Sequence, residues 1–228
     1  DTAIHKGDSI SICAKDLEIL SPEGTKLVGS ISFTIGSATS TVLVGHSGAG
    51  KTTLVNAILG FMPYQGSLKI NGTELNQIDH SSWRECVSWV GQNPLLLHGS
   101  IRDNIALGNE DASEQLLNQI LEDSYAAEFV NEHGLDYFIS DRSGGLSVGQ
   151  AQRIALARAM LQQGQFWLLD EPTASLDARS EQLVNQGLAS QIKDKTTLMV
   201  THQLEPLKNI DQILVMEDGQ IVESGNYQ

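Results

Sequence analysis

Short runs of apolar and β-branched residues recur along the first half of the chain, and glycine, proline or small polar residues bound each run. This pattern is typical of strands separated by turns. Ser21-Pro22-Glu23-Gly24 predicts a turn between the first two runs, and Asn71-Gly72 is a pair that tight hairpins favour. We predict strands at residues 10–19, 31–35, 41–44 and 87–90.

Helical segments alternate with such runs over the rest of the chain. Serine favours the start of a helix and glycine its end, so these residues mark the expected boundaries. The predicted helices are residues 51–59 before Gly60, 100–106, 113–121 and 124–132 from their first serines, 148–163 before Gly164, and 178–188. Further strands are predicted at residues 166–169, 197–201 and 213–216.

Strands that alternate with helices predict an α/β fold with a mostly parallel sheet. The pattern changes from about Pro94 to Gly145, where short helices follow one another without strands between them. We therefore predict an α/β core of residues 1–93 and 146–228, with a helical subdomain of about residues 94–145 inserted into it.

The composition narrows the classes of function. Of the 228 residues, 40% are hydrophobic and 18% charged, as in soluble globular proteins. The net charge of −14 argues against broad contact with nucleic-acid phosphates, which needs a basic face. No apolar run approaches the ~18–20 residues of a membrane span, and the first residues do not resemble a signal peptide. If the whole protein acts at a membrane, its membrane part is expected outside this chain.

The two cysteines, Cys13 and Cys86, lie far apart in the sequence and have no metal-ligand spacing around them. We interpret them as small apolar side chains in a reducing compartment. Metal binding through cysteine is therefore not expected.

A glycine-rich loop joins the predicted strand 41–44 to the predicted helix 51–59 and fits the pattern G-x-x-x-x-G-K-[ST]. Glycines let backbone N–H groups surround phosphate oxygens, and the helix directs its positive end at the same anion. Lys51 can reach the β- and γ-phosphates, and the Thr52 hydroxyl can bind Mg²⁺. The predicted phosphate-binding residues are Gly45, His46, Ser47, Gly48, Ala49, Gly50, Lys51, Thr52 and Thr53.

Two carboxylates, Asp170 and Glu171, follow the apolar strand predicted at residues 166–169. Parallel α/β sheets bind ligands beyond the carboxyl ends of their strands. Beside a phosphate loop, Asp170 suits the coordination shell of Mg²⁺ and Glu171 suits a general base that polarises the attacking water. The alternative is a pair of solvated acids at a strand end.

Further segments resemble the ATP-binding domains of ABC transporters, in the order in which that family carries them. They are Leu146-Ser147-Val148-Gly149-Gln150 (the LSGGQ signature with valine at its third position), Val90-Gly91-Gln92-Asn93-Pro94 (Q-loop), Ala174-Ser175-Leu176-Asp177 (D-loop) and Val200-Thr201-His202 (switch histidine). The resemblance implies a P-loop NTPase core with an N-terminal antiparallel β part, an inserted helical subdomain, and hydrolysis of ATP with Mg²⁺.

The resemblance also implies a site shared by two protomers. Ser147, Gly149 and Gln150 would close over the γ-phosphate held by the other protomer, and Asp177 would contact that protomer. Val148 adds bulk where many relatives have glycine. Ser147 and Gln150 also form an S-x-x-Q capping box for the helix that follows, so capping alone could explain them.

Within one protomer, the resemblance gives Gln92 a contact to Mg²⁺ or to the attacking water, and gives His202 a hydrogen bond to the γ-phosphate. Thr52, Gln92 and Asp170 would then organise the metal. Without the resemblance, Gln92 reads as a surface amide and His202 as a structural histidine.

One position departs from the family. Its members usually carry an aromatic residue before the first sheet strand, where the ring stacks on adenine. Here no aromatic residue precedes Phe33, and the position falls near Leu20 or Ser21. Since stacking of a base is worth ~1–3 kcal/mol, we expect weak discrimination between ATP and GTP.

Asp141-Arg142, just before the signature, resembles the Glu-Arg pair of exporters, which importer ATPases generally lack. Residues 64–72, 88–94, 146–158 and 196–205 resemble heterodimeric bacterial exporters of cysteine and glutathione that serve cytochrome assembly. The resemblance implies a homologous partner subunit, a membrane-spanning domain in the same full-length chain, and a place at the cytoplasmic face of the inner membrane.

Three alternatives remain open on the sequence. One is an importer ATPase, and a second is a soluble ABC-type ATPase that acts on nucleic acid or ribosomes. That second class usually has a long coiled-coil insertion or two cassettes in a chain, and neither is visible here. The third is a binding module in which nucleotide drives association without turnover.

Overall fold

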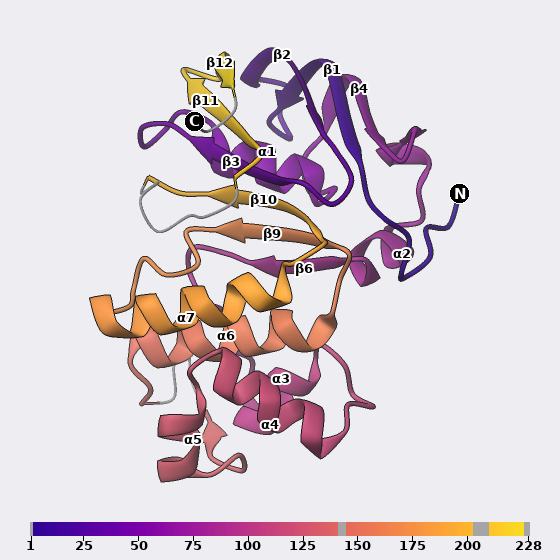
Figure 1. The fold of residues 1–228 in the computed structure, drawn as a ribbon. Coiled ribbons are helices and arrows are strands. Elements are labelled where there is room, and N and C mark those ends of the chain that lie inside the picture. Colours follow the sequence, from indigo (N-terminus) through magenta and orange to yellow (C-terminus); the bar gives the residue numbers. More distant parts are fainter. Residues whose placement is uncertain (1, 141–144, 203–209, 226–228) are drawn as a thin grey trace. The chain divides into compact units, whose positions relative to one another are not determined.

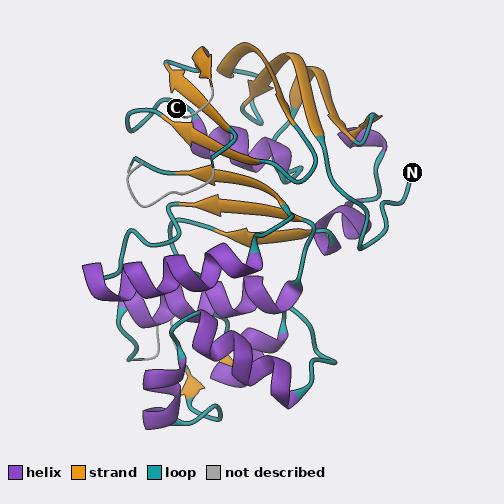
Figure 2. Cartoon of the chain, viewed as in Figure 1, coloured by secondary structure: helices purple, strands orange, loops and turns teal. Residues whose placement is uncertain are grey.

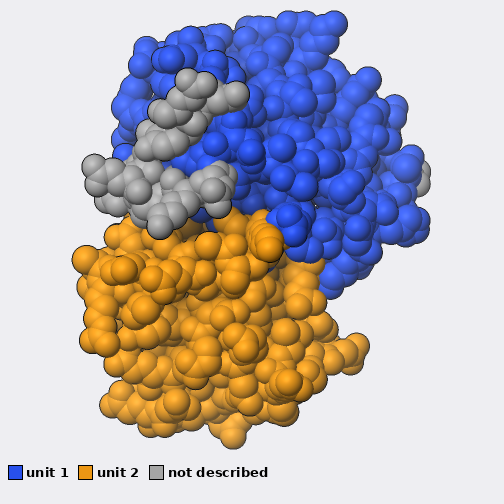
Figure 3. All heavy atoms as spheres, in the orientation of Figure 1, with its two compact units in different colours: residues 1–87, 165–170, 194–228 blue, residues 88–164, 171–193 orange. Residues whose placement is uncertain are grey.

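The computed structural model describes residues 2–140, 145–202 and 210–225. The predicted Asp141-Arg142 pair and the end of the 196–205 stretch lie outside these ranges. The chain divides into two compact units (Figure 3). The first comprises Asp1–Val87, Gln165–Asp170 and Asp194–Gln228, and the second comprises Ser88–Gly164 and Glu171–Lys193.

An antiparallel sheet forms the N-terminal part of the first unit, with the strand order β2-β1-β4-β5. Its strands are β1 (Ile12–Leu20), β2 (Lys26–Ile35), β4 (Tyr64–Ile70) and β5 (Thr73–Glu74). Alternate residues of β2 from Ile31 to Ile35 are buried, which is the period of a strand with one face in a core. This sheet confirms the predicted N-terminal antiparallel part.

The second sheet of this unit is mostly parallel and runs in the order β12-β11-β3-β10-β9 (Figure 1). The strands are β3 (Ser40–Val44), β9 (Phe166–Asp170), β10 (Thr196–Val200), β11 (Gln212–Glu217) and β12 (Gln220–Gly225). Every residue of β9 and β10 is buried, as expected for strands of a parallel sheet that is covered on both faces. The predicted α/β class is confirmed.

Helices complete the first unit: α1 (Lys51–Ile58), the 3₁₀ turn η1 (Leu75–Gln77) and α2 (His80–Glu85). In α2, Trp83 is fully buried, stacks on Phe166 at 5.8 Å between ring centroids, and donates its indole N–H to the carbonyl of Ile58 at 2.9 Å. A single side chain therefore joins α2 to the end of α1 and to the start of β9.

Helices dominate the second unit (Figure 2). They are α3 (Ile101–Ala106), α4 (Glu114–Asp123), α5 (Ala127–His133), α6 (Val148–Gln162) and α7 (Ala178–Gln191), and the strands are β6 (Val87–Val90), β7 (Gly99–Ser100) and β8 (Phe138–Ile139). Nine of the fifteen residues of α6 are buried, so α6 is the central helix against which α3 and α4 pack. No described helix has the length and apolar character needed to cross a bilayer.

The structure corrects the predicted start of α5. Ser124 does not cap this helix, because it lies at the C-terminal end of α4, where its buried hydroxyl donates to the Leu121 carbonyl at 3.3 Å. The first helical residue is Ala127, and Ala126 occupies the cap without a side-chain hydrogen bond. A serine can cap either end of a turn, and only packing decides which.

Other predicted boundaries moved by a few residues. α6 ends at Gln162, one residue before the predicted end, and its cap is Gln163 in the left-handed conformation (φ 53°). The sequence pattern missed α2 and β12, which are six residues long each. The division into a core of residues 1–93 and 146–228 and a helical subdomain of about 94–145 stays a prediction; the second unit groups α6 and α7 with the helices of that segment.

Candidate functional site

The phosphate loop lies between β3 and α1 in the first unit, as predicted. Gly50 is the N-cap of α1 with φ 102°, and Gly48 is also left-handed at φ 83°. The first turn of α1 contains no acidic residue, and no side chain caps its N–H groups. These N–H groups are therefore available to an anion at the positive end of the helix.

Lys51 lies over this loop. Its ammonium group donates to the carbonyl oxygens of Gly45 and His46 at 2.7 and 2.8 Å. The loop is also bound to the turn between β11 and β12, because the N–H of Gly219 in that turn donates to the carbonyl of Ala49 at 3.0 Å. The positive charge of Lys51 and the N-terminus of α1 thus share one short loop.

Thr52 and Asp170 meet although 118 positions separate them in sequence. The Thr52 hydroxyl lies 3.3 Å from Oδ2 of Asp170, whose side chain is buried at the end of β9 with a residue exposure of 5%. A hydroxyl and a carboxylate are oxygen ligands of the kind that Mg²⁺ prefers. Among the described residues, no cluster of three or more His, Cys, Asp or Glu side chains could hold a metal ion.

His202 follows β10, which pairs in parallel with β3 on one side and with β9 on the other. In this register Val200 lies opposite Leu43 of β3 and opposite Asp170 of β9. The carboxyl ends of the three strands therefore meet at one sheet edge, where the phosphate loop, Asp170 and the exposed His202 follow them.

Glu171 is the first residue of the Glu171–Lys193 segment of the second unit and follows Asp170 directly in the chain. Its backbone is left-handed (φ 49°), and Oε2 of its carboxylate accepts a hydrogen bond from Nε2 of Gln92 at 3.1 Å. The structure thus pairs the predicted Q-loop glutamine with the predicted general base.

The signature segment forms the N-terminal turn of α6. Ser147 is the N-cap, its hydroxyl accepts from the Gln150 N–H at 3.1 Å, and Gln150 Oε1 accepts from the Ser147 N–H at 2.8 Å. The predicted capping box is therefore present. Val148 is 60% exposed, so its added bulk points away from the rest of the unit.

Asp177 caps α7, where its carboxylate accepts from the N–H groups of Arg179 and Ser180 and from the Ser180 hydroxyl. The hydrogen bonds from the hydroxyl and N–H of Ser180 lower the pKa of this exposed carboxyl below its usual value. Asp177 therefore has a local capping role besides the contact to a second protomer that the sequence predicts.

The predicted site residues form two groups, one on each unit. The first unit holds the phosphate loop, Thr53, Asp170 and His202, and the second holds Gln92, Glu171, Asp177 and the signature residues. Sequence reasoning missed Gln152 of α6, a fully buried amide whose Nε2 donates to the carbonyl of Pro172 at 2.9 Å. Its signal was weak, since a glutamine beside a signature reads as a surface residue.

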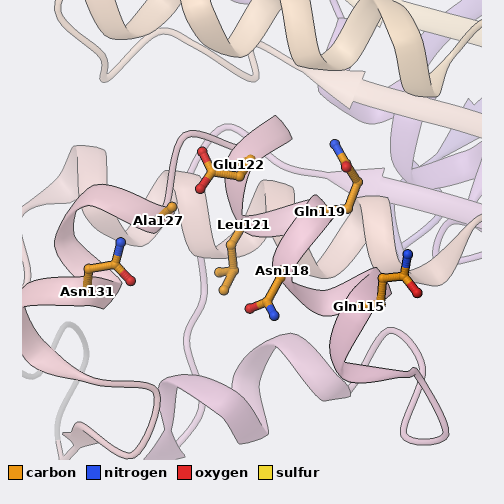
Figure 4. Close-up of a pocket in the computed structure, with 7 residues that line it drawn as sticks. All are labelled: Gln115, Asn118, Gln119, Leu121, Glu122, Ala127 and Asn131. Atoms are coloured by element: carbon orange, nitrogen blue, oxygen red, sulfur yellow. The ribbon is translucent and has the colours of Figure 1, made fainter.

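A separate pocket of about 580 Å³ lies between α4 and α5 and contains none of the predicted residues (Figure 4). Its lining is mostly amide side chains, from Gln115, Asn118, Gln119 and Asn131, with Leu121, Glu122 and Ala127.

Known proteins resemble this chain over its whole length. Residues 28–174 match the ABC transporter family. The chain is 51% identical over 227 residues to the glutathione/L-cysteine transport system ATP-binding/permease protein CydD of Haemophilus influenzae, covering 100% of this chain and 39% of that protein. It is 50% identical over 222 residues to CydD of Escherichia coli, covering 96% of this chain and 38% of that one.

A solved structure gives the same result for the fold. A bacterial Atm1-family ABC exporter with ATP bound superposes with a TM-score of 0.91 at 27% identity, over 98% of this chain and 40% of that one. The chain thus spans well under half the length of each of these proteins. It belongs to the ABC transporter family, whose ATP-binding domains hydrolyse ATP to power transport.

Proposed function

We propose that this chain binds MgATP and hydrolyses it to ADP and phosphate as the motor domain of an exporter. The observation that carries the proposal is the sheet edge at which β3, β10 and β9 end. It brings the phosphate loop, His202 and Asp170 together from three separate segments of the chain. An anion cradle beside an oxygen-ligand pair is the arrangement that a metal-bound triphosphate needs.

Each predicted residue then has one role. The loop N–H groups and Lys51 bind the phosphates, and His202 donates a hydrogen bond to the γ-phosphate. Thr52, Gln92 and Asp170 would hold Mg²⁺, which supplies positive charge to the phosphate oxygens when it is bound. The Glu171 carboxylate accepts a proton from the water that attacks the γ-phosphorus.

A second protomer completes the site. Ser147, Gly149 and Gln150 of each protomer lie at the positive end of α6, a helix of fifteen residues, so they can bind the γ-phosphate held by the other. Asp177 contacts the opposite protomer. The exposed Val148 faces that protomer together with Ser147, Gly149 and Gln150. A single protomer is therefore expected to hydrolyse ATP slowly.

The transported substrate and partner follow from the relatives. We infer an exporter of cysteine and glutathione that serves cytochrome assembly, with this domain at the cytoplasmic face of the bacterial inner membrane. Its partner is a homologous CydC-like subunit, and a membrane-spanning domain belongs to the same full-length chain. The support is 50–51% identity to two CydD proteins whose names give glutathione and L-cysteine transport.

Replacing Lys51 with alanine tests nucleotide binding directly. Because hydrogen bonds to charged groups contribute about 1.5–3 kcal/mol, the Kd for MgATP is expected to rise about 10- to 150-fold. Isothermal titration calorimetry measures this change, and Lys15→Ala, which removes an exposed lysine from β1 of the same unit, is the control. Equal heats for Lys51→Ala and Lys15→Ala would refute the phosphate loop assignment.

The base site should discriminate weakly between nucleotides. The β1–β2 hairpin comes close to the phosphate loop, since a Cβ atom built on Gly50 would lie 3.1 Å from Cγ2 of Val28. Leu20 at the end of β1 is partly buried and offers no ring for stacking. A stacking ring would add ~1–3 kcal/mol to the binding of either base, and this chain lacks it for both. We therefore expect the Kd values for MgATP and MgGTP to agree within about tenfold.

Adding the ring should reverse this deficit. The variant Leu20→Tyr is expected to bind both nucleotides about 5- to 150-fold more tightly, the equivalent of one base stack. Leu107→Tyr places the same ring at an exposed leucine of the other unit and should change neither Kd. A strong preference of the native chain for ATP, or no gain in Leu20→Tyr, would contradict the assignment.

A further inference from the structure

Gln152 in α6 carries a feature that packing alone does not explain. Its side chain is fully buried, and its Nε2 donates to the Pro172 carbonyl at 2.9 Å. Its Oε1 is also buried but has no hydrogen-bond partner among the residues that the structure describes. A buried amide with one orphaned oxygen costs stability that an apolar side chain of the same length would not.

The side-chain hydrogen bond of Gln152 reaches the turn that begins at Glu171. Glu171 holds a left-handed backbone (φ 49°), which a residue with a side chain adopts only when its surroundings enforce it. Within this turn the Ala174 N–H donates to the Glu171 carbonyl at 3.2 Å. Gln152 of α6 binds the carbonyl of the following residue, Pro172. The turn is therefore held by a hydrogen bond of its own backbone and by a second hydrogen bond from α6.

The same turn packs against the start of α6. A Cβ atom built on Gly149 would lie 3.2 Å from the Ser175 carbonyl oxygen and 3.5 Å from Cδ2 of Leu176. Gln152 lies three residues further along the helix and reaches Pro172. The first turns of α6 and residues 171–176 are therefore in direct contact at two points, one of them a hydrogen bond.

We propose that Gln152 is a positioning residue that holds the Glu171 turn against the signature turn of α6, so that the general base and the signature move as one body. The inference rests on the proposed function, in which Glu171 is the base and Ser147 and Gly149 bind the partner's nucleotide. Gln152 touches no reacting atom; it acts through the backbone of Pro172 on the carboxylate next to it.

The test replaces Gln152 with methionine, which keeps the length of the side chain and removes both polar atoms. Loss of one hydrogen bond is offset by removal of the orphaned oxygen, so the Tm is expected to stay within about 4 °C of the native value. Misplacement of a catalytic group costs on the order of 10²-fold, so kcat for ATP hydrolysis should fall about 10- to 100-fold. The KM for MgATP should not change, because the phosphate loop is untouched.

The measurement uses the complete transporter that contains this chain, with its partner subunit present. Gln182→Met, an exposed glutamine of α7, is the matched control and should leave kcat and Tm unchanged. The decisive readout is the double variant. If Gln152 acts through Glu171, adding Gln152→Met to Glu171→Gln produces no further loss of kcat, because the base that it positions is already absent.

The outcomes separate two failures. If Glu171→Gln retains native turnover, the proposed base is wrong, whatever Gln152 does. If Glu171→Gln is inactive but Gln152→Met retains native kcat, Gln152 does not position the base. If Gln152→Met instead lowers the Tm by much more than 4 °C and kcat falls along with the loss of folded protein, Gln152 has only a structural role. A full further loss in the double variant would also overturn the inference.

Discussion

Replacing Glu171 with glutamine is expected to slow ATP hydrolysis by about 10²- to 10⁴-fold, the usual contribution of a general base. Glutamine has the same shape, and its amide oxygen can still accept the hydrogen bond from Gln92, which spans 3.1 Å in the native chain. It cannot take the proton of the attacking water. Release of phosphate in a single turnover, with the partner present, measures the rate.

Binding of MgATP should survive this substitution, because the phosphate loop and Lys51 are unchanged. Glu132→Gln, an exposed glutamate of α5, removes the same charge from the same unit and should keep native turnover. A Glu171→Gln protein that hydrolyses ATP at the native rate would show that another group accepts the proton. If the native protein binds MgATP but does not hydrolyse it, that result would instead support a binding module.

Gly66→Ala is expected to cause a large loss of stability. A Cβ atom there would lie 2.1 Å from the carbonyl oxygen of Asp16 and 2.7 Å from its carbonyl carbon, at a φ of 82°. Asp16 lies where the pairing of β1 with β4 shifts register, and it has a left-handed φ of 48°. Backbone of β1 must therefore move, and we expect a cost of about 2–4 kcal/mol, or about 5–15 °C in Tm.

Gly72→Ala is the control that isolates the steric part. Gly72 has nearly the same φ, 83°, but a Cβ atom built there meets nothing within 4 Å. It should cost only the strain of a left-handed alanine, about 1 kcal/mol, or about 2–4 °C in Tm. Calorimetry of the two variants gives the difference. Equal Tm values would show that β1 yields without resistance and that conformational strain accounts for the whole effect.

The sequence was sufficient wherever one contiguous segment contains all the necessary atoms. The phosphate loop needs only a strand, its glycines and the helix that follows, and these lie within residues 41–59. The capping box of Ser147 and Gln150 spans four positions, so its spacing already implied both hydrogen bonds. The hairpin at Asn71-Gly72 was predictable for the same reason, since both residues adopt the left-handed φ that such turns require.

Predictions failed where a neighbour distant in sequence chose between two local possibilities. Ser124 could begin one helix or end another, and its burial at the C-terminal end of α4 selected the end. Gln152 could face solvent or the core, and only the packing of α6 against the Glu171 turn made it a buried donor. Neither the position of Ser124 nor the burial of Gln152 can be recognised from the residues next to them in the sequence.

The sequence by itself therefore determined the chemistry available to this protein: an anion loop, an acidic pair after a buried strand, a capped signature and a histidine after another strand. The tertiary structure alone decided which of these groups meet. Thr52 reaches Asp170 because α1 packs near β9, and Glu171 meets Gln92 across 79 positions of chain. Strand order and helix packing are set by burial summed over the whole core, and no single segment contains that sum.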